Sequence, residues 1–222
     1  MIIKRLALGA ALVALGLGSA QAEYLGPING RSANPGNLPP LSVEGNFASS
    51  DFYQFIGGRV NYRVSPELVV FGDLGLIEIG PGFSDADGLG FGLGAYFYLA
   101  NQQILPQLDI AAKGSYHFGQ VEFDGITGVN PITGAVTTGG VDLDVSNISL
   151  EVLVSGKEPL TANGLGWYAN AGIQIAGGDG PDDTEILLGG GAYLPLGPGE
   201  AYGGIDLIDE LTIGIGYRFF IN

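Results

Sequence analysis

The residue pair best suited to chemistry is Ser115 and His117, which stand two positions apart in an alternating segment. Successive side chains of a β-strand point to opposite faces, so these two residues share a face. With a carboxylate from Glu151 or Asp109 they would form a Ser/His/acid set of the kind used in acyl transfer. His117 is the single histidine of the chain, so a hydrolase would have to be built around it.

Two features count against such a hydrolase. Same-face neighbours on a strand lie about 6.5–7 Å apart, which is too far for a fixed Ser–His hydrogen bond. The chain also has no Gly-x-Ser-x-Gly nucleophile elbow. We therefore interpret His117 as a histidine that bonds a neighbouring carboxylate, and we expect no catalytic residue and no enzyme.

Neither a metal site nor a cofactor site is predicted. Residues 179–185 hold four carboxylates, and their oxygens suit Ca²⁺ or Mg²⁺, but the spacing differs from that of a twelve-residue Ca²⁺ loop. A solvated acidic loop is the simpler interpretation. The glycines at 88, 90, 92 and 94 keep a strict two-residue period, which marks a strand and not a phosphate-binding loop.

The segments that carry these residues alternate with a period of two, and a helical period fits none of them. The chain is therefore predicted to be all-β. We expect ten strands, or eight if the first or the ninth does not span, near 41–49, 53–64, 68–79, 88–99, 107–118, 143–155, 166–176, 185–195, 201–207 and 210–221. The longest connection is then expected at about 119–142.

Both ends of the chain carry export signals. Lys4 and Arg5 precede an apolar run that ends in small residues at 19–22, so residues 1–22 are predicted to be a cleaved signal peptide. Residues 23–40 are rich in Pro, Gly and Asn and are expected to be irregular. The last strand presents apolar residues on one face and ends in aromatic residues. It resembles the C-terminal assembly signal of bacterial outer-membrane barrels through Thr212, Gly214, Tyr217 and Phe219.

The chain as a whole resembles the small bacterial outer-membrane β-barrel family of OmpA-like transmembrane and opacity-type barrel proteins. The resemblance implies an antiparallel up-and-down transmembrane β-barrel over 41–222, in the outer membrane of a Gram-negative cell. It also implies contact with outer-membrane lipid, lipopolysaccharide and the barrel-assembly machinery, and a structural or cell-surface interaction role with an unidentified extracellular ligand. The net charge of −15 excludes a nucleic-acid partner.

The strand face opposite the large apolar residues is expected to line the lumen. Glycines gather on it, and so do charged residues of both signs that would cost about 2–4 kcal/mol each against lipid. The predicted lumen charge network is Glu44, Arg59, Arg63, Asp73, Asp109, Lys113, His117, Glu151 and Arg218.

Three functions remain open at this stage. A charge-paired, largely plugged lumen favours the structural or surface-interaction role. The second is a narrow, cation-preferring porin-like channel, because the connections at one end are acidic. The third and least favoured is a lipid-modifying outer-membrane hydrolase built on Ser115 and His117. A soluble ligand-binding barrel with its apolar face inward is the alternative fold.

Overall fold

The computed structural model describes residues 26–36, 38–51, 53–79, 86–99, 106–129, 136–178 and 183–221. The predicted signal peptide at 1–22 lies outside the described residues, as do Asp85, Asp179 and Asp182 of the acidic segments. None of the described residues forms a helix long and apolar enough to cross a membrane.

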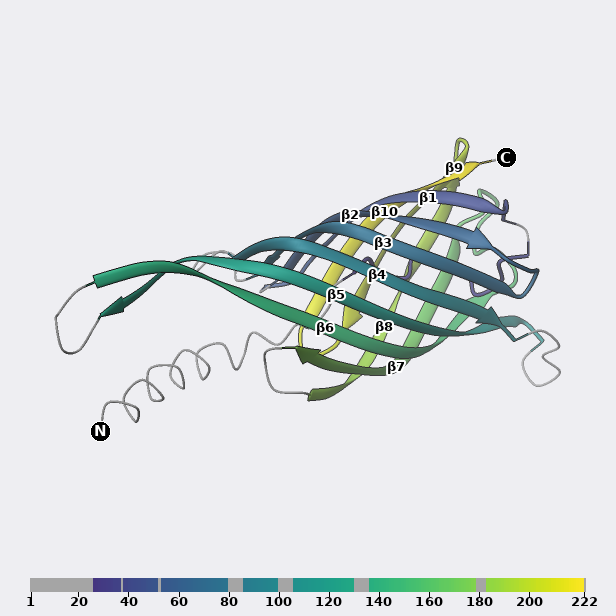
Figure 1. The fold of residues 1–222 in the computed structure, drawn as a ribbon. Helices are drawn as coiled ribbons and strands as arrows, with labels where there is room; N and C mark the ends of the chain where they lie inside the picture. The colour runs from purple at the N-terminus through teal and green to yellow at the C-terminus, as the bar shows by residue number, and fades with distance from the viewer. Residues whose placement is uncertain are drawn as a thin grey trace.

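Ten antiparallel strands form a single closed barrel, which confirms the predicted fold class and the larger strand number (Figure 1). The strands are β1 (Leu41–Ser49), β2 (Tyr53–Arg63), β3 (Leu68–Ile79), β4 (Ala86–Tyr98), β5 (Leu108–Val129), β6 (Val136–Gly156), β7 (Gly166–Gly178), β8 (Asp183–Leu196), β9 (Gly199–Leu207) and β10 (Leu211–Ile221). Each strand pairs with its neighbours in sequence, and β1 closes the ring against β10.

The closing pair fixes the two ends of the barrel. Leu41 lies opposite Ile221, and Ser49 lies opposite Ile213. We call the end with Leu41 and Ile221 the proximal end, and the end with Ser49 and Ile213 the distal end. Because β1 pairs with β10 along the whole length of β1, the ring is closed at the seam.

The outer face of the barrel is apolar. Along β3, β4 and β8 the outward residues Leu74, Leu93 and Ile186 are 61%, 70% and 71% exposed, while their neighbours in sequence point inward. A barrel in water places its apolar residues inside, around the core. This barrel therefore has the opposite arrangement, with an apolar exterior suited to lipid. The alternative of a soluble barrel does not fit it.

The segment at 119–142 does not form the long connection that the sequence predicts. Strands β5 and β6 continue through it, and their pairing runs out to Val129 opposite Val136, with a register shift between Phe123 and Ile126. The prediction was wrong because the Gly and Asp content of the segment outweighed its alternation. Pairing of β5 with β4 ends at Phe123, so the β5–β6 hairpin extends beyond its neighbours at the distal end (Figure 1).

Side chains in the lumen form three layers. An apolar cluster at the distal end consists of Ala48, Tyr53, Phe55, Ile77, Val121, Leu187 and Ile208. A second cluster at the proximal end consists of Ala33, Val69, Phe71, Tyr96, Ala111, Leu153 and Tyr168. Charged and amide side chains fill the middle layer. Ala33 does not belong to any strand, so the chain before β1 takes part in the filling.

Candidate functional site in the barrel lumen

Arg59 and Asp73 form the best-defined ion pair of the middle layer. Arg59 Nε and Nη2 donate to the two carboxylate oxygens of Asp73 at 2.6 and 2.8 Å. The guanidinium also donates to the Tyr96 hydroxyl at 3.0 Å and lies 4.1 Å from the centre of the Phe71 ring. The pair spans the facing positions of β2 and β3, so the register of these strands places it. A bidentate pair of this kind holds both side chains in one orientation.

The Ser/His/acid arrangement, the least favoured alternative from the sequence, does not form among the described residues. His117 Nε2 lies 2.9 Å from Asp73 Oδ2, so the imidazole joins the Arg59–Asp73 pair. Ser115 Oγ instead lies 2.7 Å from Ser149 Oγ, whose hydroxyl donates to Glu151 at 3.1 Å. No hydrogen bond joins Ser115 to His117 in the described part of the chain, and His117 takes the role expected of a histidine that bonds a carboxylate.

Arg218 holds β10 to the carboxylates of β1 and β9. Its Nε donates to Glu44 and its Nη1 to Glu200, both at 2.8 Å. Glu44 also accepts from Asn61 at 2.6 Å and from the Tyr202 hydroxyl at 2.7 Å. Glu200 was not among the predicted lumen residues, because it reads from the sequence as part of a turn.

Lys113 and Glu151 form the third ion pair, between β5 and β6. The Lys113 ammonium donates to Glu151 Oε1 at 2.6 Å, and Asn170 donates to Oε2 at 3.1 Å. Asp109 accepts a hydrogen bond from the Tyr98 hydroxyl at 2.8 Å. Buried charges are costly unless they are paired or hydrogen-bonded, and these contacts make the inner wall a connected polar network.

The main feature that the sequence does not reveal is the position of residues 26–36, which we call the N-terminal segment. It enters the lumen at the proximal end and runs through the middle layer without forming a strand. Ile28 and Asn29 have no exposed surface. Ile28 packs against β10, where a Cβ added to Gly214 would lie 2.7 Å from its side chain. The segment therefore fills space that the glycines of the inner wall leave open.

Three consecutive residues of the N-terminal segment are held by separate contacts. Asn29 Nδ2 donates to Glu151 Oε2 at 2.8 Å, and its Oδ1 accepts from the Tyr96 hydroxyl at 3.3 Å. The carbonyl of Gly30 accepts from Arg218 Nη2 at 3.2 Å. Arg31 is buried, with its guanidinium 4.3 Å from the centre of the Tyr96 ring.

Further contacts hold the segment near the proximal end. Arg31 Nη1 donates to Asn61 Oδ1 at 3.2 Å, and the amide of Ala33 donates to Ser155 Oγ at 2.9 Å. Arg63 donates to the carbonyl oxygens of Pro35 and Gly36 at 3.3 and 2.8 Å. Arg63 thus binds the segment and not a carboxylate. Arg31 is absent from the predicted network because it precedes every alternating run, so no strand pattern marks it as inward.

The residues of the predicted assembly signal alternate along β10. Thr212 and Gly214 point into the barrel, whereas Phe219 lies on the exterior. The Tyr217 hydroxyl donates to the carbonyl of Leu196 at 2.7 Å and so ties the end of β10 to that of β8. Each of these residues is therefore part of the barrel wall.

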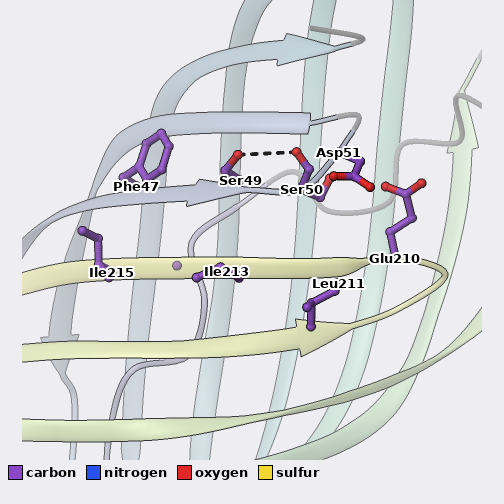
Figure 2. Close-up of a pocket in the computed structure, with 9 residues that line it drawn as sticks. Phe47, Ser49, Ser50, Asp51, Glu210, Leu211, Ile213 and Ile215 are labelled. Atoms are coloured by element: carbon purple, nitrogen blue, oxygen red, sulfur yellow. Dashed lines mark hydrogen bonds between the residues drawn. The ribbon is translucent and has the colours of Figure 1, made fainter.

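The distal rim brings carboxylates together. Asp51 and Glu210 point toward each other in a pocket between β1 and β10, which Phe47 and Ile215 also line (Figure 2). Burial, and then the charges of Asp51 and Asp209, raise the pKa of Glu210. No group of three or more residues able to hold a metal ion occurs among the residues that the structure describes.

No family model and no curated protein matches this sequence. Several solved structures are similar in fold. A KdgM porin matches at 8% identity over 82% of this chain and 99% of its own, with a TM-score of 0.45. The N-terminal β-barrel domain of OprF from Pseudomonas aeruginosa matches at 14% identity over 81% and 96%, with a TM-score of 0.35. The translocator domain of the autotransporter NalP from Neisseria meningitidis matches at 11% identity over 82% and 87%, with a TM-score of 0.39.

These TM-scores are low, so the class of the protein follows from its own geometry. An apolar exterior, a closed ring of ten strands and an interior of paired charges define a transmembrane β-barrel. Within that class, this barrel has a lumen occupied by its own N-terminal segment.

Proposed function

We propose that the protein is an outer-membrane β-barrel that does not conduct and that serves a structural or cell-surface interaction role. The observation that carries the proposal is the filled lumen. Ion pairs between neighbouring strands line the middle layer, and the N-terminal segment occupies the space between them. A pore needs a continuous aqueous path, whereas these side chains and this backbone bond one another.

The distal end is the face proposed to meet other molecules. Outer-membrane barrels place short turns on the periplasmic side and longer structures outside. The β5–β6 hairpin extends at the distal end, so we assign that end to the cell exterior. Acidic residues there, among them Asp51 and Glu210, suit divalent cations that bridge to lipopolysaccharide phosphates. The extracellular ligand, if it is a protein, would meet the hairpin first.

The two other functions receive less support. The carboxylates of the acidic rim would favour cations in a narrow channel. Such a channel requires the N-terminal segment to leave the lumen. A lipid-modifying hydrolase requires Ser115 and His117 to act together, and each bonds a different partner. Export by a cleaved signal peptide and folding by the barrel-assembly machinery remain part of the proposal.

Conductance tests the proposal. The refolded chain that begins at Glu23 is reconstituted in planar bilayers under a salt gradient, and folding is verified by a heat-dependent gel shift. We expect no discrete conductance steps. Discrete cation-selective steps that change in the Lys113→Ala or Arg218→Ala variant would establish a pore and overturn the proposed role.

A further inference from the structure

We propose that the lumen is a peptide-binding site, and that the N-terminal segment is its tethered ligand. The segment is held as a bound peptide is held, through side chains, backbone and shape, and not as a strand added to the sheet. The ligand class that the site would accept is an extended peptide with the sequence Asn-Gly-Arg at its centre. The inference rests on the proposed function in one respect, which is that the segment fills the lumen.

The side chain of Asn29 is recognised at both ends of its amide. Glu151 accepts from the nitrogen, and Tyr96 donates to the oxygen. An aspartate at this position would place a second carboxylate beside Glu151, and a leucine would leave Glu151 and Tyr96 without these partners. Two opposed partners of this kind suit an amide, because its nitrogen donates and its oxygen accepts on the two sides of one planar group.

Gly30 is recognised by shape. Its φ is +53°, a conformation that residues with a Cβ adopt only at a cost. An added Cβ would also overlap the ring of Tyr202, which the Glu44 carboxylate holds in place through the Tyr202 hydroxyl. The backbone therefore approaches the wall at a point where only glycine fits, and its carbonyl accepts from Arg218 there.

Arg31 is recognised through two uncharged partners. Its guanidinium stacks on Tyr96 and donates to Asn61, and none of the ion pairs found in the described residues includes it. The attraction between a cation and the face of an aromatic ring is stronger in a buried site than in a hydrated one. Over the described inner wall as a whole, buried acidic residues outnumber buried basic ones, which favours a cationic guest. The acidic residues are Glu44, Asp73, Asp109, Glu151 and Asp206, and the basic ones are Arg59, Lys113 and Arg218.

The site is entered from the proximal end. Ser155 and Arg63 hold the backbone of the segment where it enters, and the distal apolar cluster lies beyond Gly26. Under the orientation proposed above, the entrance faces the periplasm. A free peptide that carries the same three residues would therefore compete with the segment from that side.

To test the proposal, a single substitution is used to release the N-terminal segment from the lumen. Gly30→Val would force a side chain into the Tyr202 ring and release the segment. A fluorescent synthetic peptide with the sequence of residues 26–36 is then added to the refolded variant, and binding is followed by anisotropy. We expect saturable binding to the Gly30→Val barrel and no binding to the unmodified barrel, whose site is already occupied.

Control peptides define the recognition. A peptide with Arg31→Ala should bind at least about 10-fold more weakly, because it loses the aromatic stack and a hydrogen bond to a charged group. A peptide with Gly30→Val should not bind. The matched barrel control is Gly45→Val on β1, where an added Cβ would meet no atom within 4 Å, and it should behave as the unmodified barrel does.

A second readout reports the segment directly. The chain has no cysteine, so Ala33→Cys introduces a single thiol at a position that is 2% exposed. Its reaction with a maleimide should accelerate by at least about 10-fold when Gly30→Val is added, since buried thiols react only after local opening. If Gly30→Val prevents folding, as judged by the gel shift, the Arg31→Ala barrel replaces it in both assays.

The proposal is overturned if the folded, vacated barrel fails to bind the peptide, or if a scrambled peptide binds equally well. Equal maleimide rates in the two backgrounds would overturn it as well. These outcomes are separate from the conductance test, because an unmodified barrel that stays silent in bilayers supports lumen closure whether or not the site recognises peptides.

Discussion

The side-chain amide of Asn29 donates a hydrogen bond to Glu151 at 2.8 Å and so joins the N-terminal segment to β6 across 122 residues of sequence. The same carboxylate accepts from Lys113, Ser149 and Asn170. Glu151 is thus the point where three strands and the segment meet. Removing the charge of Glu151 should weaken its contacts with the strands and with the segment together. Replacing Asn29 should weaken only the attachment of the segment.

Glu151→Gln is expected to destabilise the barrel by about 3–5 kcal/mol, because it leaves the Lys113 ammonium buried without a carboxylate. Asn29→Ala should cost less, about 1–3 kcal/mol, since Glu151 keeps Lys113 and its other donors while the Tyr96 hydroxyl loses its acceptor. Urea unfolding in lipid vesicles, followed through the fluorescence of the single tryptophan, measures both. The paired replacement Glu151→Leu with Lys113→Met is the control and should recover much of the loss. An equal cost for the two single variants would contradict this assignment.

The Arg59–Asp73 pair predicts that substitutions of its two residues have non-additive effects on the free energy of unfolding. Asp73→Leu alone leaves Arg59 buried without its bidentate partner and should cost about 3–5 kcal/mol. Adding Arg59→Met should cost little more, so a double-mutant cycle should give a coupling energy of at least about 1 kcal/mol. The measurement is again urea unfolding. Strictly additive effects would show that the pair does not hold β2 to β3.

The exterior can be tested with a single charge. Leu74→Arg places a guanidinium on the outer face near the middle of β3 and should cost about 2–4 kcal/mol in a bilayer. The matched control is Thr184→Arg, at the exposed distal start of β8, which should cost less than about 1 kcal/mol. Equal costs in vesicles would mean that the outer face does not contact lipid.

The rim carboxylates predict a small pH dependence. Burial and the charges of Asp51 and Asp209 raise the pKa of Glu210 above its ordinary value of 4.5. The folded state therefore holds this proton more tightly than the unfolded state does. The resulting stability is complete below pH 4.5 and is lost as the pH rises through the raised pKa.

Glu210→Gln should remove this dependence. Between about pH 4 and pH 7 the difference in unfolding free energy between the variant and the unmodified chain should shift in favour of the variant, by less than about 1 kcal/mol because exposed charges are screened. Glu158→Gln, which removes a carboxylate from an exposed proximal turn, is the control for loss of one surface charge. A shift in the opposite direction would mean that the rim stabilises the charged carboxylate.

The sequence predicts the wall well because the wall obeys a local rule. The strand predicted over 68–79 has the bounds that β3 has in the structure. The inward charges follow from the same rule, since Lys113 and Glu151 each occupy the phase opposite the large apolar residues of an alternating run. Which carboxylate faces which base depends on strand register, and the sequence does not determine that register.

The position of the N-terminal segment could not be predicted from the sequence, for a different reason. Its contacts join Asn29 and Arg31 to residues far along the chain, and none of them leaves a period in the local sequence. Proline, glycine and asparagine correctly indicate a segment without regular structure, but they do not indicate what surrounds it. The β5–β6 extension was missed because the Gly and Asp content of 119–142 outweighed its alternation, and the pairing also shifts register between Phe123 and Ile126.

The position of the N-terminal segment can be tested most directly by a disulfide trap. Ser32 Oγ lies 3.1 Å from Ser155 Oγ, and cysteines at both positions fall within the reach of a disulfide bond. In a chain otherwise without cysteine, Ser32→Cys with Ser155→Cys should cross-link on oxidation after refolding, as read by a reversible mobility shift and intact mass. Ser32→Cys with Ser49→Cys, at the opposite end of the barrel, should not. Free thiols in the folded Ser32→Cys/Ser155→Cys variant would place the segment outside the lumen and contradict the account.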